Sequence, residues 1–253
     1  MQRLKEKVIA VAGGAGGIGS ELSRRYAAEG AKVLVGDLNA EGAAKVAAGI
    51  KASGGVAEAI ALDLGEEDSI KAFVARAEEA FGGLDGLHAN AAYFGGDKTA
   101  DTDIVNIDMA IFDKIMQINS RGYALCSRYA IPAMLRRGGG SIVYTSSGAA
   151  FLPDAGRLAY SMSKAALHAL MRHVADHWGR EGVRANVIAP GVIIHEKHAN
   201  NIGLQEWAKQ RVRVNYLGES KDIAAMGALL LSEEGRYITG QVISVDGGSS
   251  MRQ

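Results

Sequence analysis

KVIAVAGGAGGIGSEL, residues 7–22, is the stretch that decides the fold of this 253-residue chain. An apolar run typical of a buried strand leads into five glycines within seven residues, from Gly13 to Gly19, and then into a helical pattern. Glycine permits positive φ and a close approach of the backbone to a ligand. Free N–H groups at the start of a helix attract phosphate. We expect a strand, a phosphate-binding turn and a helix; the alternative is a tight turn without a ligand.

The rest of the chain continues this alternation of short apolar runs and longer helical patterns. Runs that are apolar throughout their middle predict strands covered on both faces, and they lie at residues 7–13, 32–37, 56–63, 84–90, 140–147, 183–190 and 240–248. Helical patterns lie between them at residues 17–29, 40–52, 66–81, 108–135, 158–178 and 221–231. This order predicts an α/β fold, a single doubly wound domain over residues 1–253. Its seven-stranded parallel sheet would carry helices on both faces.

The composition excludes several classes of protein. The 28 basic and 28 acidic side chains balance, so the chain has no bulk basic field for nucleic acid or an anionic membrane. Cys126 is the single cysteine, which rules out an internal disulfide and fits a reducing compartment. No apolar run approaches the roughly 18 residues of a membrane helix, and residues 8–12 are too short for a signal-peptide core. We expect a cytoplasmic protein that binds a small molecule.

The ends of the predicted strands hold the first candidate for cofactor selection. Ligands of such sheets bind beyond the carboxyl ends of the strands, and the second strand ends at Asp37, 18 residues after Gly19. A carboxylate there accepts hydrogen bonds from the adenosine ribose and repels a 2′-phosphate. The next residue, Leu38, offers no cation for that phosphate. The pattern favours NAD over NADP; the alternative is that Asp37 only caps the following helix.

A tyrosine and a lysine follow the fifth predicted strand. Ser146 and Ser147 end that strand, and the next helix carries Tyr160 and Lys164 in the pattern YSMSK. Positions i and i+4 share one face of a helix. An ammonium beside a phenol favours the phenolate and lowers its pKa, so Tyr160 is a candidate general base near neutral pH. A solvated tyrosine–lysine pair would show the same spacing.

Taken together, these motifs resemble those of the short-chain dehydrogenase/reductase family, in its branch of about this length. The resemblance covers essentially the whole chain and implies a Rossmann-type fold. The motifs stand in the family's order: the glycine motif, Asp63-Leu64, the N-A stretch at Asn90, a serine (Ser147) followed after twelve residues by Y-x-x-x-K, Pro190-Gly191, and YITGQVISVDGG at 237–248.

The resemblance implies a catalytic tetrad of Asn119, Ser147, Tyr160 and Lys164. Tyr160 would take the proton of a substrate alcohol while hydride passes to nicotinamide. Ser147, which the family's spacing selects over Ser146, would bind the substrate oxygen. Lys164 would hold the nicotinamide ribose and tune Tyr160, and Asn119 would hold a water in a proton relay to Lys164.

The implied activity is that of an NAD(H)-dependent alcohol dehydrogenase or carbonyl reductase, an oxidoreductase that interconverts a secondary alcohol and a ketone. Two alternatives remain open: a protein that senses NADH without turnover, and a non-redox dehydratase or epimerase. The cofactor contacts of the family fall on Gly13, Gly17, Ile18, Gly19, Asp37, Leu38, Asp63, Leu64, Asn90, Ala91, Tyr160, Lys164, Pro190, Gly191 and Ile193. The helices expected at 108–135 and 158–178 resemble those that pair subunits in the family, which implies a homotetramer.

Family analogy places substrate contacts in two segments, residues 92–108 and 194–218, of which the second is expected to be a mobile lid. The candidates for contact with a fairly apolar alcohol or ketone are Tyr93, Phe94, Ala149, Val192, His195 and Trp207. The alternative is that half of the aromatic and aliphatic candidates are packing residues. For His195 the alternative is an exposed lid residue.

The chain departs from the family pattern at three positions. Ala12 stands where a threonine usually precedes the first motif glycine, Ala92 stands where a glycine usually ends the N-A stretch, and His195 stands where a threonine often touches the carboxamide. His173 and His177 share a helix face, but a metal site needs a third ligand and an open position. We therefore predict no metal.

Overall fold

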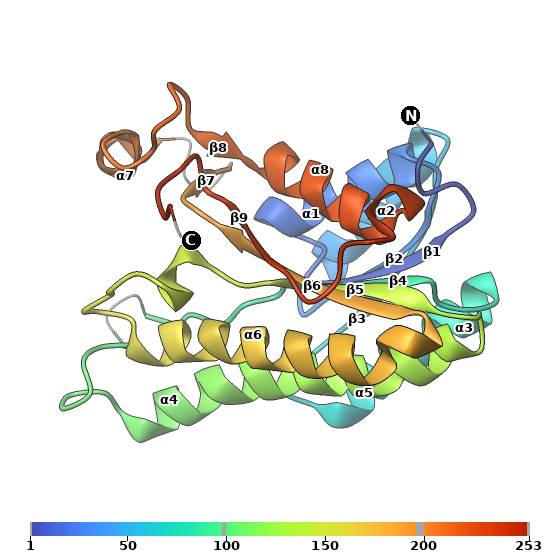
Figure 1. Cartoon of the computed structure of the whole chain (residues 1–253), viewed down its shortest axis with the longest axis horizontal. Helices are drawn as coiled ribbons and strands as arrows, with labels where there is room; N and C mark the ends of the chain where they lie inside the picture. Colours follow the sequence, from blue (N-terminus) through green and yellow to red (C-terminus); the bar gives the residue numbers. More distant parts are fainter. Residues whose placement is uncertain (1, 98–99, 196–199, 252–253) are drawn as a thin grey trace.

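The computed structural model describes residues 2–97, 100–195 and 200–251. Its main sheet has seven strands in the order β3-β2-β1-β4-β5-β6-β9, and every pairing is parallel, as the sequence predicts (Figure 1). The strands are β1 (Val8–Ala12), β2 (Lys32–Asp37), β3 (Val56–Ala61), β4 (Gly86–Ala89), β5 (Gly140–Thr145), β6 (Val183–Pro190) and β9 (Val242–Val245). The order reverses between β1 and β4, which is where such sheets bind ligands.

Helices cover both faces of the sheet. One face carries α1 (Gly17–Ala28), α2 (Ala40–Ala52) and α8 (Ser220–Leu231); the other carries α3 (Glu67–Phe81), α5 (Gly122–Leu135) and α6 (Leu158–Trp178) (Figure 1). Short 3₁₀ helices lie at Gly148–Ala150, Gly179–Glu181 and Glu233–Gly235. The expected ranges of α1, α2, α3, α6 and α8 are met to within one residue at each end. Helix termini follow local chemistry: the Asn39 side chain caps α2, and α3 ends at Gly82 with a φ of +82°.

The helix expected at 108–135 has an unexpected turn in its middle. It comprises α4 (Met109–Met116), a π-helical segment at Gln117–Arg121, and α5. Such π turns are frequent at functional sites, and the fully buried Asn119 lies within this one. A hydrophobic pattern does not reveal the extra residue in a turn, so the sequence predicts only an uninterrupted helix.

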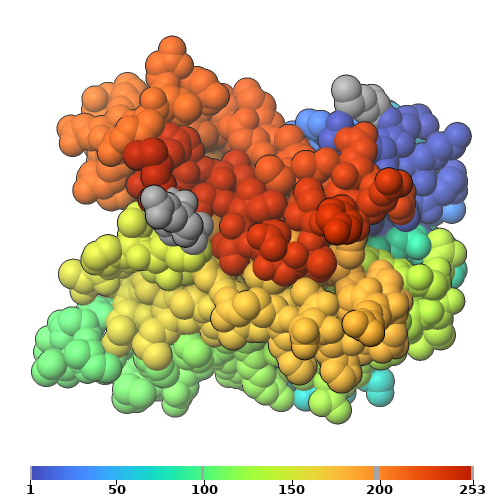
Figure 2. All heavy atoms as spheres, in the orientation of Figure 1, coloured from blue at the N-terminus to red at the C-terminus, as the bar shows by residue number. Residues whose placement is uncertain are grey.

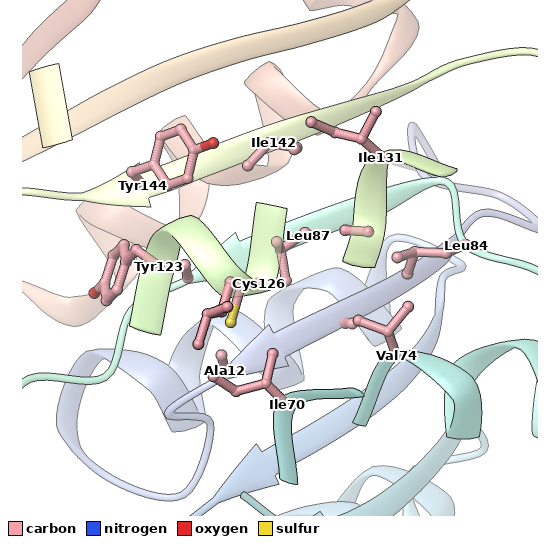
Figure 3. Packing of buried hydrophobic residues seen from close by; sticks show 14 of the residues in the cluster. Ala12, Ile70, Val74, Leu84, Leu87, Tyr123, Cys126, Ile131, Ile142 and Tyr144 are labelled. Carbon is pink, nitrogen blue, oxygen red and sulfur yellow. The ribbon is translucent and has the colours of Figure 1, made fainter. Parts of the chain in front are cut away.

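Two apolar layers fix the helices to the sheet. Figure 3 shows one of them, in which Ile70 and Val74 of α3 and Cys126 of α5 face Leu87 of β4. The stripe expected on α3 is confirmed: Ile70, Phe73, Val74 and Ala77 are buried. Burying a side chain of this size contributes about 1.5–3 kcal/mol. The packed layers therefore hold the carboxyl ends of the strands in fixed relative positions.

The segment between β6 and α8 forms a small substructure that the sequence does not predict. It contains β7 (Ile193–Ile194) paired in parallel with β8 (Gly218–Glu219), and α7 (Ile202–Lys209). In Figures 1 and 2 this orange segment lies at the same end of the molecule as the carboxyl end of β9. Part of the expected lid at 194–218, residues 196–199, lies outside the described residues.

No helix in the part of the chain that the structure describes is both long enough and apolar enough to cross a membrane. Over the same ranges, no three His, Cys, Asp or Glu side chains are grouped as metal ligands would be.

Candidate active site

The glycine-rich turn packs so closely that side chains would not fit at its key positions. Gly13 has a φ of +84°, and a Cβ there would lie 2.5 Å from the Cα of Ala91. A Cβ at Gly19 would overlap the carbonyl oxygen of Gly13. The N–H groups of Gly13 and Gly14 both donate to the oxygen of Gly36, at 2.7 and 3.0 Å. The turn therefore brings β1, β2 and β4 to one point.

The start of α1 is open above this turn. Gly16 is its N-cap residue and supplies no side-chain cap, and a Cβ at Gly16 would have nothing within 4 Å. The first N–H groups of a helix have no partner inside the helix and favour an anion. An uncapped helix start beneath open space fits the pyrophosphate of a dinucleotide, and Gly13, Gly17, Ile18 and Gly19 surround it.

Asp37 lies beside the turn at the end of β2. Its carboxylate accepts hydrogen bonds from the backbone N–H groups of Ala15 and Asn39, both at 2.9 Å. The cap of α2 is Asn39, whose side chain accepts from the Gly42 N–H at 3.0 Å, so the alternative that Asp37 caps this helix is wrong. Leu38 is 74% exposed. The Asp37 carboxylate is thus held at the edge of the open space above the glycine-rich turn. The neighbouring Leu38 supplies no positive charge there.

The residue after β4 contacts the glycine-rich turn directly, whereas the residues after β3 stabilise a turn of their own. The side chain of Asp63 accepts from the Gly65 N–H at 2.8 Å, and Leu64 is buried. Asn90 donates from Nδ2 to the Gly13 oxygen at 3.1 Å. Asn90 and Ala91 therefore pack directly against the glycine turn, whereas Asp63 shapes its own loop.

Tyr160, Ser147 and Lys164 meet beyond the end of β5. Tyr160 and Lys164 are both buried on the sheet-facing side of α6, and the Lys164 Nζ lies 5.7 Å from the centroid of the Tyr160 ring. The Ser147 side chain lies close enough to the Tyr160 phenol to act on its pKa. Lys164 donates from Nζ to the Thr145 carbonyl at 2.9 Å and to the Tyr123 hydroxyl at 3.4 Å. Tyr160 and Lys164 are therefore not the solvated tyrosine–lysine pair that the same spacing could also have indicated.

Burial governs the protonation of this pair. It raises the pKa of Tyr160, although the nearby Ser147 side chain and the charge of Arg157 act in the opposite direction. Burial also lowers the pKa of Lys164 to about 7. The expectation that Lys164 lowers the pKa of Tyr160 is wrong for this structure. The site that brings the two side chains together also disfavours the charged form of both.

Asn119 connects the π turn to two neighbouring elements. Its Oδ1 accepts from the Tyr93 N–H at 2.8 Å, and its Nδ2 donates to the Tyr93 carbonyl at 2.9 Å and to the Ser163 Oγ at 3.2 Å. Ser163 in turn donates to the Tyr160 carbonyl at 2.7 Å. Asn119 thus ties the loop after β4 to α6, and these contacts position the backbone beside Tyr160.

Asp101 is a functional candidate that sequence reasoning missed. Its carboxylate is 2% exposed and accepts from the N–H groups of Ala159 and Tyr160, at 2.9 and 2.8 Å. It therefore caps the first turn of α6 and fixes the backbone that carries Tyr160. The contact spans 59 residues of sequence, so no local pattern could reveal it.

Two of the substrate candidates contact the Tyr160–Ser147 pair directly. The ring of Phe94 stacks on that of Tyr160, with centroids 4.9 Å apart, and Phe94 is 53% exposed. The N–H of Ala149 donates to the Ser147 Oγ at 3.2 Å. The Arg157 guanidinium lies 5.3 Å from the Tyr160 centroid and pairs with Asp154. An apolar surface and a positive charge thus both border the phenol.

The remaining substrate candidates are spread around the site. His195 lies against the glycine turn, since a Cβ at Gly17 would be 3.5 Å from its imidazole ring. Trp207 on α7 stacks with Arg211, whose guanidinium is 3.9 Å from the ring centroid. Val192 lines a cavity of about 190 Å³ that is also bordered by the segment between β6 and α8. The ring of Tyr93 lies 5.1 Å from the Lys114 Nζ. The structure therefore places His195 on the side of the site that borders the glycine-rich turn.

Comparison with known proteins places this geometry in a family. A family model described as enoyl-(acyl carrier protein) reductase matches residues 13–250. The 7alpha-hydroxysteroid dehydrogenase of Bacteroides fragilis is 35% identical over 250 residues, which cover 98% of this chain and 96% of that protein. A 2,5-dichloro-2,5-cyclohexadiene-1,4-diol dehydrogenase of Sphingobium indicum is 36% identical, with 98% of each chain covered.

Solved structures agree with these matches. A 7α-hydroxysteroid dehydrogenase complexed with NADH and 7-oxo glycochenodeoxycholic acid superposes with a TM-score of 0.91 and 31% identity, over 98% of this chain and 95% of that one. A hydroxysteroid dehydrogenase from Escherichia coli superposes with a TM-score of 0.86 and 29% sequence identity, over 99% of each chain. The fold and the site define a Rossmann-type oxidoreductase. Within that class, the chain belongs to the short-chain dehydrogenase/reductase family.

Proposed function

We propose that this protein is an NAD(H)-dependent oxidoreductase that interconverts a secondary alcohol and a ketone, with Tyr160 as the general acid and base. The observation that carries the proposal is the meeting of Tyr160, Ser147 and Lys164 at the carboxyl end of β5. This edge of the sheet also holds the uncapped start of α1. A phosphate site and a proton donor at one edge suit a dinucleotide-dependent reaction.

The residues of the glycine turn would hold the dinucleotide. Gly13, Gly17 and Gly19 allow the backbone to approach the pyrophosphate, and Asp37 would accept from the adenosine ribose hydroxyls. Further contacts would come from Leu38, Asp63, Leu64, Asn90, Ala91, Pro190, Gly191 and Ile193. When bound, the nicotinamide supplies the carbon that accepts or releases hydride. The complex of the related 7α-hydroxysteroid dehydrogenase with NADH supports this assignment.

Residues of the protein would transfer the proton to and from the substrate oxygen. Because burial keeps the Tyr160 phenol protonated, it is set to donate a proton to a ketone oxygen during reduction. In the oxidative direction, Tyr160 must first lose that proton, so oxidation should accelerate as the pH rises. Ser147 would hydrogen-bond the substrate oxygen and stabilise the negative charge that develops on it.

Lys164 and Asn119 would support this step. Lys164 would hold the nicotinamide ribose, and its lowered pKa of about 7 lets it exchange a proton near neutral pH. Asn119 would hold the water of a proton relay; its contacts with Tyr93 and Ser163 also orient α6. These roles of Lys164 and Asn119 come from the family resemblance and are part of the proposal.

We infer that the substrate carries its hydroxyl on a carbon ring. Phe94 presents a half-exposed aromatic face beside Tyr160, and Leu152, in the turn after Ser147, is 44% exposed. The names of the relatives denote ring-borne hydroxyls, on a steroid and on a cyclohexadienediol. An apolar ring would lie on Phe94, with Tyr93, Ala149, Val192, His195 and Trp207 as further candidate contacts.

Spectrophotometry at 340 nm tests the activity. NAD and NADP are each offered with cyclic, steroid, aryl and aliphatic secondary alcohols, and reduced nicotinamide is expected with NAD and a cyclic alcohol. Binding of NADH without any turnover would favour the sensor alternative. A product formed without net change in nicotinamide would favour dehydration or epimerisation.

The preference for NAD can be tested at Asp37. The variant Asp37→Ala removes the carboxylate that would bind the ribose hydroxyls and repel a 2′-phosphate. We expect the ratio of NAD to NADP efficiency, measured as kcat/KM for each, to fall by about tenfold or more, equivalent to about 1.4 kcal/mol.

Asp68→Ala is the matched control for this variant, because it also removes a carboxylate, but an exposed one in the first turn of α3 that is not among the proposed cofactor contacts. It should leave the ratio near that of the wild type. An unchanged ratio in Asp37→Ala would show that this carboxylate does not select the cofactor.

We also propose that the protein is a cytoplasmic homotetramer, with residues 1–253 as one domain and 194–218 as its lid. An exposed groove of about 310 Å³ runs between α5 and α6, the helices expected to pair subunits, and it is lined by apolar residues that include Ile131, Leu170 and Trp178. Light scattering after size-exclusion chromatography should give four times the chain mass. A stable monomer at micromolar concentration would exclude the tetramer.

A further inference from the structure

A buried chain of hydrogen bonds runs from α1 through the sheet to the glycine turn. The Tyr26 hydroxyl lies 2.6 Å from Nδ1 of His88, and Nε2 of His88 lies 2.9 Å from Oγ1 of Thr145. Thr145 donates from Oγ1 to Oδ1 of Asn90 at 3.1 Å. Asn90 then donates from Nδ2 to the Gly13 carbonyl at 3.1 Å. The chain links α1, β4, β5 and the turn that follows β1.

The direction of every bond follows from its last member. The Gly13 carbonyl can only accept, so the NH₂ group of Asn90 faces it and the amide oxygen faces Thr145. The single hydroxyl proton of Thr145 is donated to that oxygen, so His88 must donate to Thr145 from Nε2. In a neutral imidazole, its Nδ1 is then the acceptor for Tyr26. With a neutral His88 all the bonds point the same way, and bonds aligned in this way strengthen one another.

The surroundings of the chain favour this neutral state. Tyr26 and His88 are completely buried, and Thr145 is 6% exposed. Burial lowers the pKa of His88 to about 3 and raises that of Tyr26 well above its ordinary value. Neither group therefore changes charge at neutral pH, and the chain is suited to hold positions and not to move protons.

Helix α8 leaves room for the Tyr26 end of this chain of hydrogen bonds. A Cβ at Gly227 would overlap the Tyr26 hydroxyl and would lie 3.2 Å from Nδ1 of His88. Glycine inside a helix costs about 0.5–1 kcal/mol relative to alanine. The glycine at position 227 therefore gives the Tyr26–His88 pair the room that a larger residue of α8 would occupy.

The Asn90 end of this chain of hydrogen bonds holds the peptide that opens the glycine-rich turn. This peptide joins Gly13 to Gly14: its carbonyl accepts from Asn90, and its N–H donates to the Gly36 carbonyl at 3.0 Å. Glycine on both sides would otherwise let the peptide rotate. A carbonyl oxygen turned toward the start of α1 would repel a phosphate. Ala12, just before the turn, has no hydroxyl that could hold it.

We propose that Tyr26, His88 and Thr145 are positioning residues that orient the Asn90 amide and, through it, the Gly13–Gly14 peptide for dinucleotide binding. The inference rests on the proposed function, because it requires that this turn binds a dinucleotide. It assigns a role in affinity to side chains that touch neither the cofactor nor the substrate.

The central test compares two substitutions at Thr145 by titration with NADH, followed by its fluorescence. Thr145→Val keeps the shape and removes the hydroxyl, and should weaken NADH binding about tenfold, the effect expected for one buried hydrogen-bond link. Thr145→Ser keeps the hydroxyl and should bind within about twofold of the wild type. An unchanged Kd in Thr145→Val would overturn the proposal. Failure of the wild type to bind NADH would instead overturn the proposed function.

A double-mutant cycle tests whether the distant Tyr26 acts through the same chain. Tyr26→Phe should weaken NADH binding about threefold in the wild type and should have no further effect in Thr145→Val, because coupled sites are not additive. Independent, additive effects would contradict the proposal. Tyr26→Phe removes only one oxygen atom. If Thr145→Val does not fold, the Kd of Tyr26→Phe for NADH therefore still tests the proposal, and an unchanged Kd would contradict it.

Tyr144→Phe is the matched control. Its hydroxyl is also completely buried and lies 2.7 Å from the Ser127 Oγ, in the other core layer. Its melting temperature should fall about as much as that of Tyr26→Phe, while its Kd for NADH should stay at the wild-type value. An equal loss of affinity in both variants would show a general effect of stability and would overturn the assignment.

Discussion

Tyr160→Phe is expected to reduce turnover by about 10³-fold or more, in either direction of the reaction, while the affinity for NADH stays close to that of the wild type. General acid–base catalysis by one positioned side chain contributes about 10²–10⁴-fold. In this structure the phenol contacts Ser147 and stands at the end of the β5 strand. Removing its oxygen takes away the group that would exchange the substrate proton.

The substitution should leave the site otherwise intact. The phenyl ring can keep its stack with Phe94, 4.9 Å between centroids, and the backbone N–H of residue 160 still reaches Asp101. Steady-state kinetics and an NADH titration separate the two effects. Tyr129→Phe, which removes a half-buried hydroxyl bonded to Glu67 on α3, should keep full activity. A Tyr160→Phe enzyme with most of its activity would refute the assigned mechanism.

Gly19→Ala is expected to weaken NADH binding by at least about 100-fold. A Cβ at this position would overlap the Gly13 carbonyl and would come within 3.0 Å of Nδ2 of Asn90. Both atoms belong to the backbone turn or to its direct anchor, so the turn must open to relieve the overlap. A distortion that costs about 2.7 kcal/mol of binding energy corresponds to that loss of affinity.

Isothermal titration with NADH measures the effect of Gly19→Ala, and circular dichroism shows whether the sheet is retained. Gly49→Ala serves as the control, because a Cβ on this exposed position of α2 would meet nothing within 4 Å. That variant should bind NADH normally and gain about 0.5–1 kcal/mol of stability. Wild-type affinity in Gly19→Ala would mean that the dinucleotide does not use this turn.

Local patterns predicted most of the fold. The seven parallel strands and both helical layers follow from continuous apolar runs and helical spacing, and α2 and α6 begin and end at the expected residues. The interior of a doubly wound sheet is apolar on both faces, so the strand signal is strong. The family resemblance and the fold that it implied are confirmed by the comparisons.

Features that depend on contacts between distant residues could not be predicted. The buried cap from Asp101 to α6 and the chain from Tyr26 to Asn90 join residues far apart in sequence. The raised pKa of Tyr160 depends on how deeply the site is buried, which residue spacing does not report. The π turn at Asn119 and the small sheet of β7 and β8 likewise have no hydrophobic periodicity of their own.

The central claim is that a hydrogen passes directly between the carbinol carbon of a secondary alcohol and the nicotinamide, while Tyr160 exchanges the proton. Its most direct test uses cyclohexanol, or a cyclic alcohol active at 340 nm, deuterated at the carbinol carbon and incubated with NAD in ordinary water. We expect the reduced nicotinamide to gain one mass unit by mass spectrometry. It should also form more slowly than with the undeuterated alcohol. Reduced nicotinamide without deuterium, or product without any reduced nicotinamide, would contradict the account.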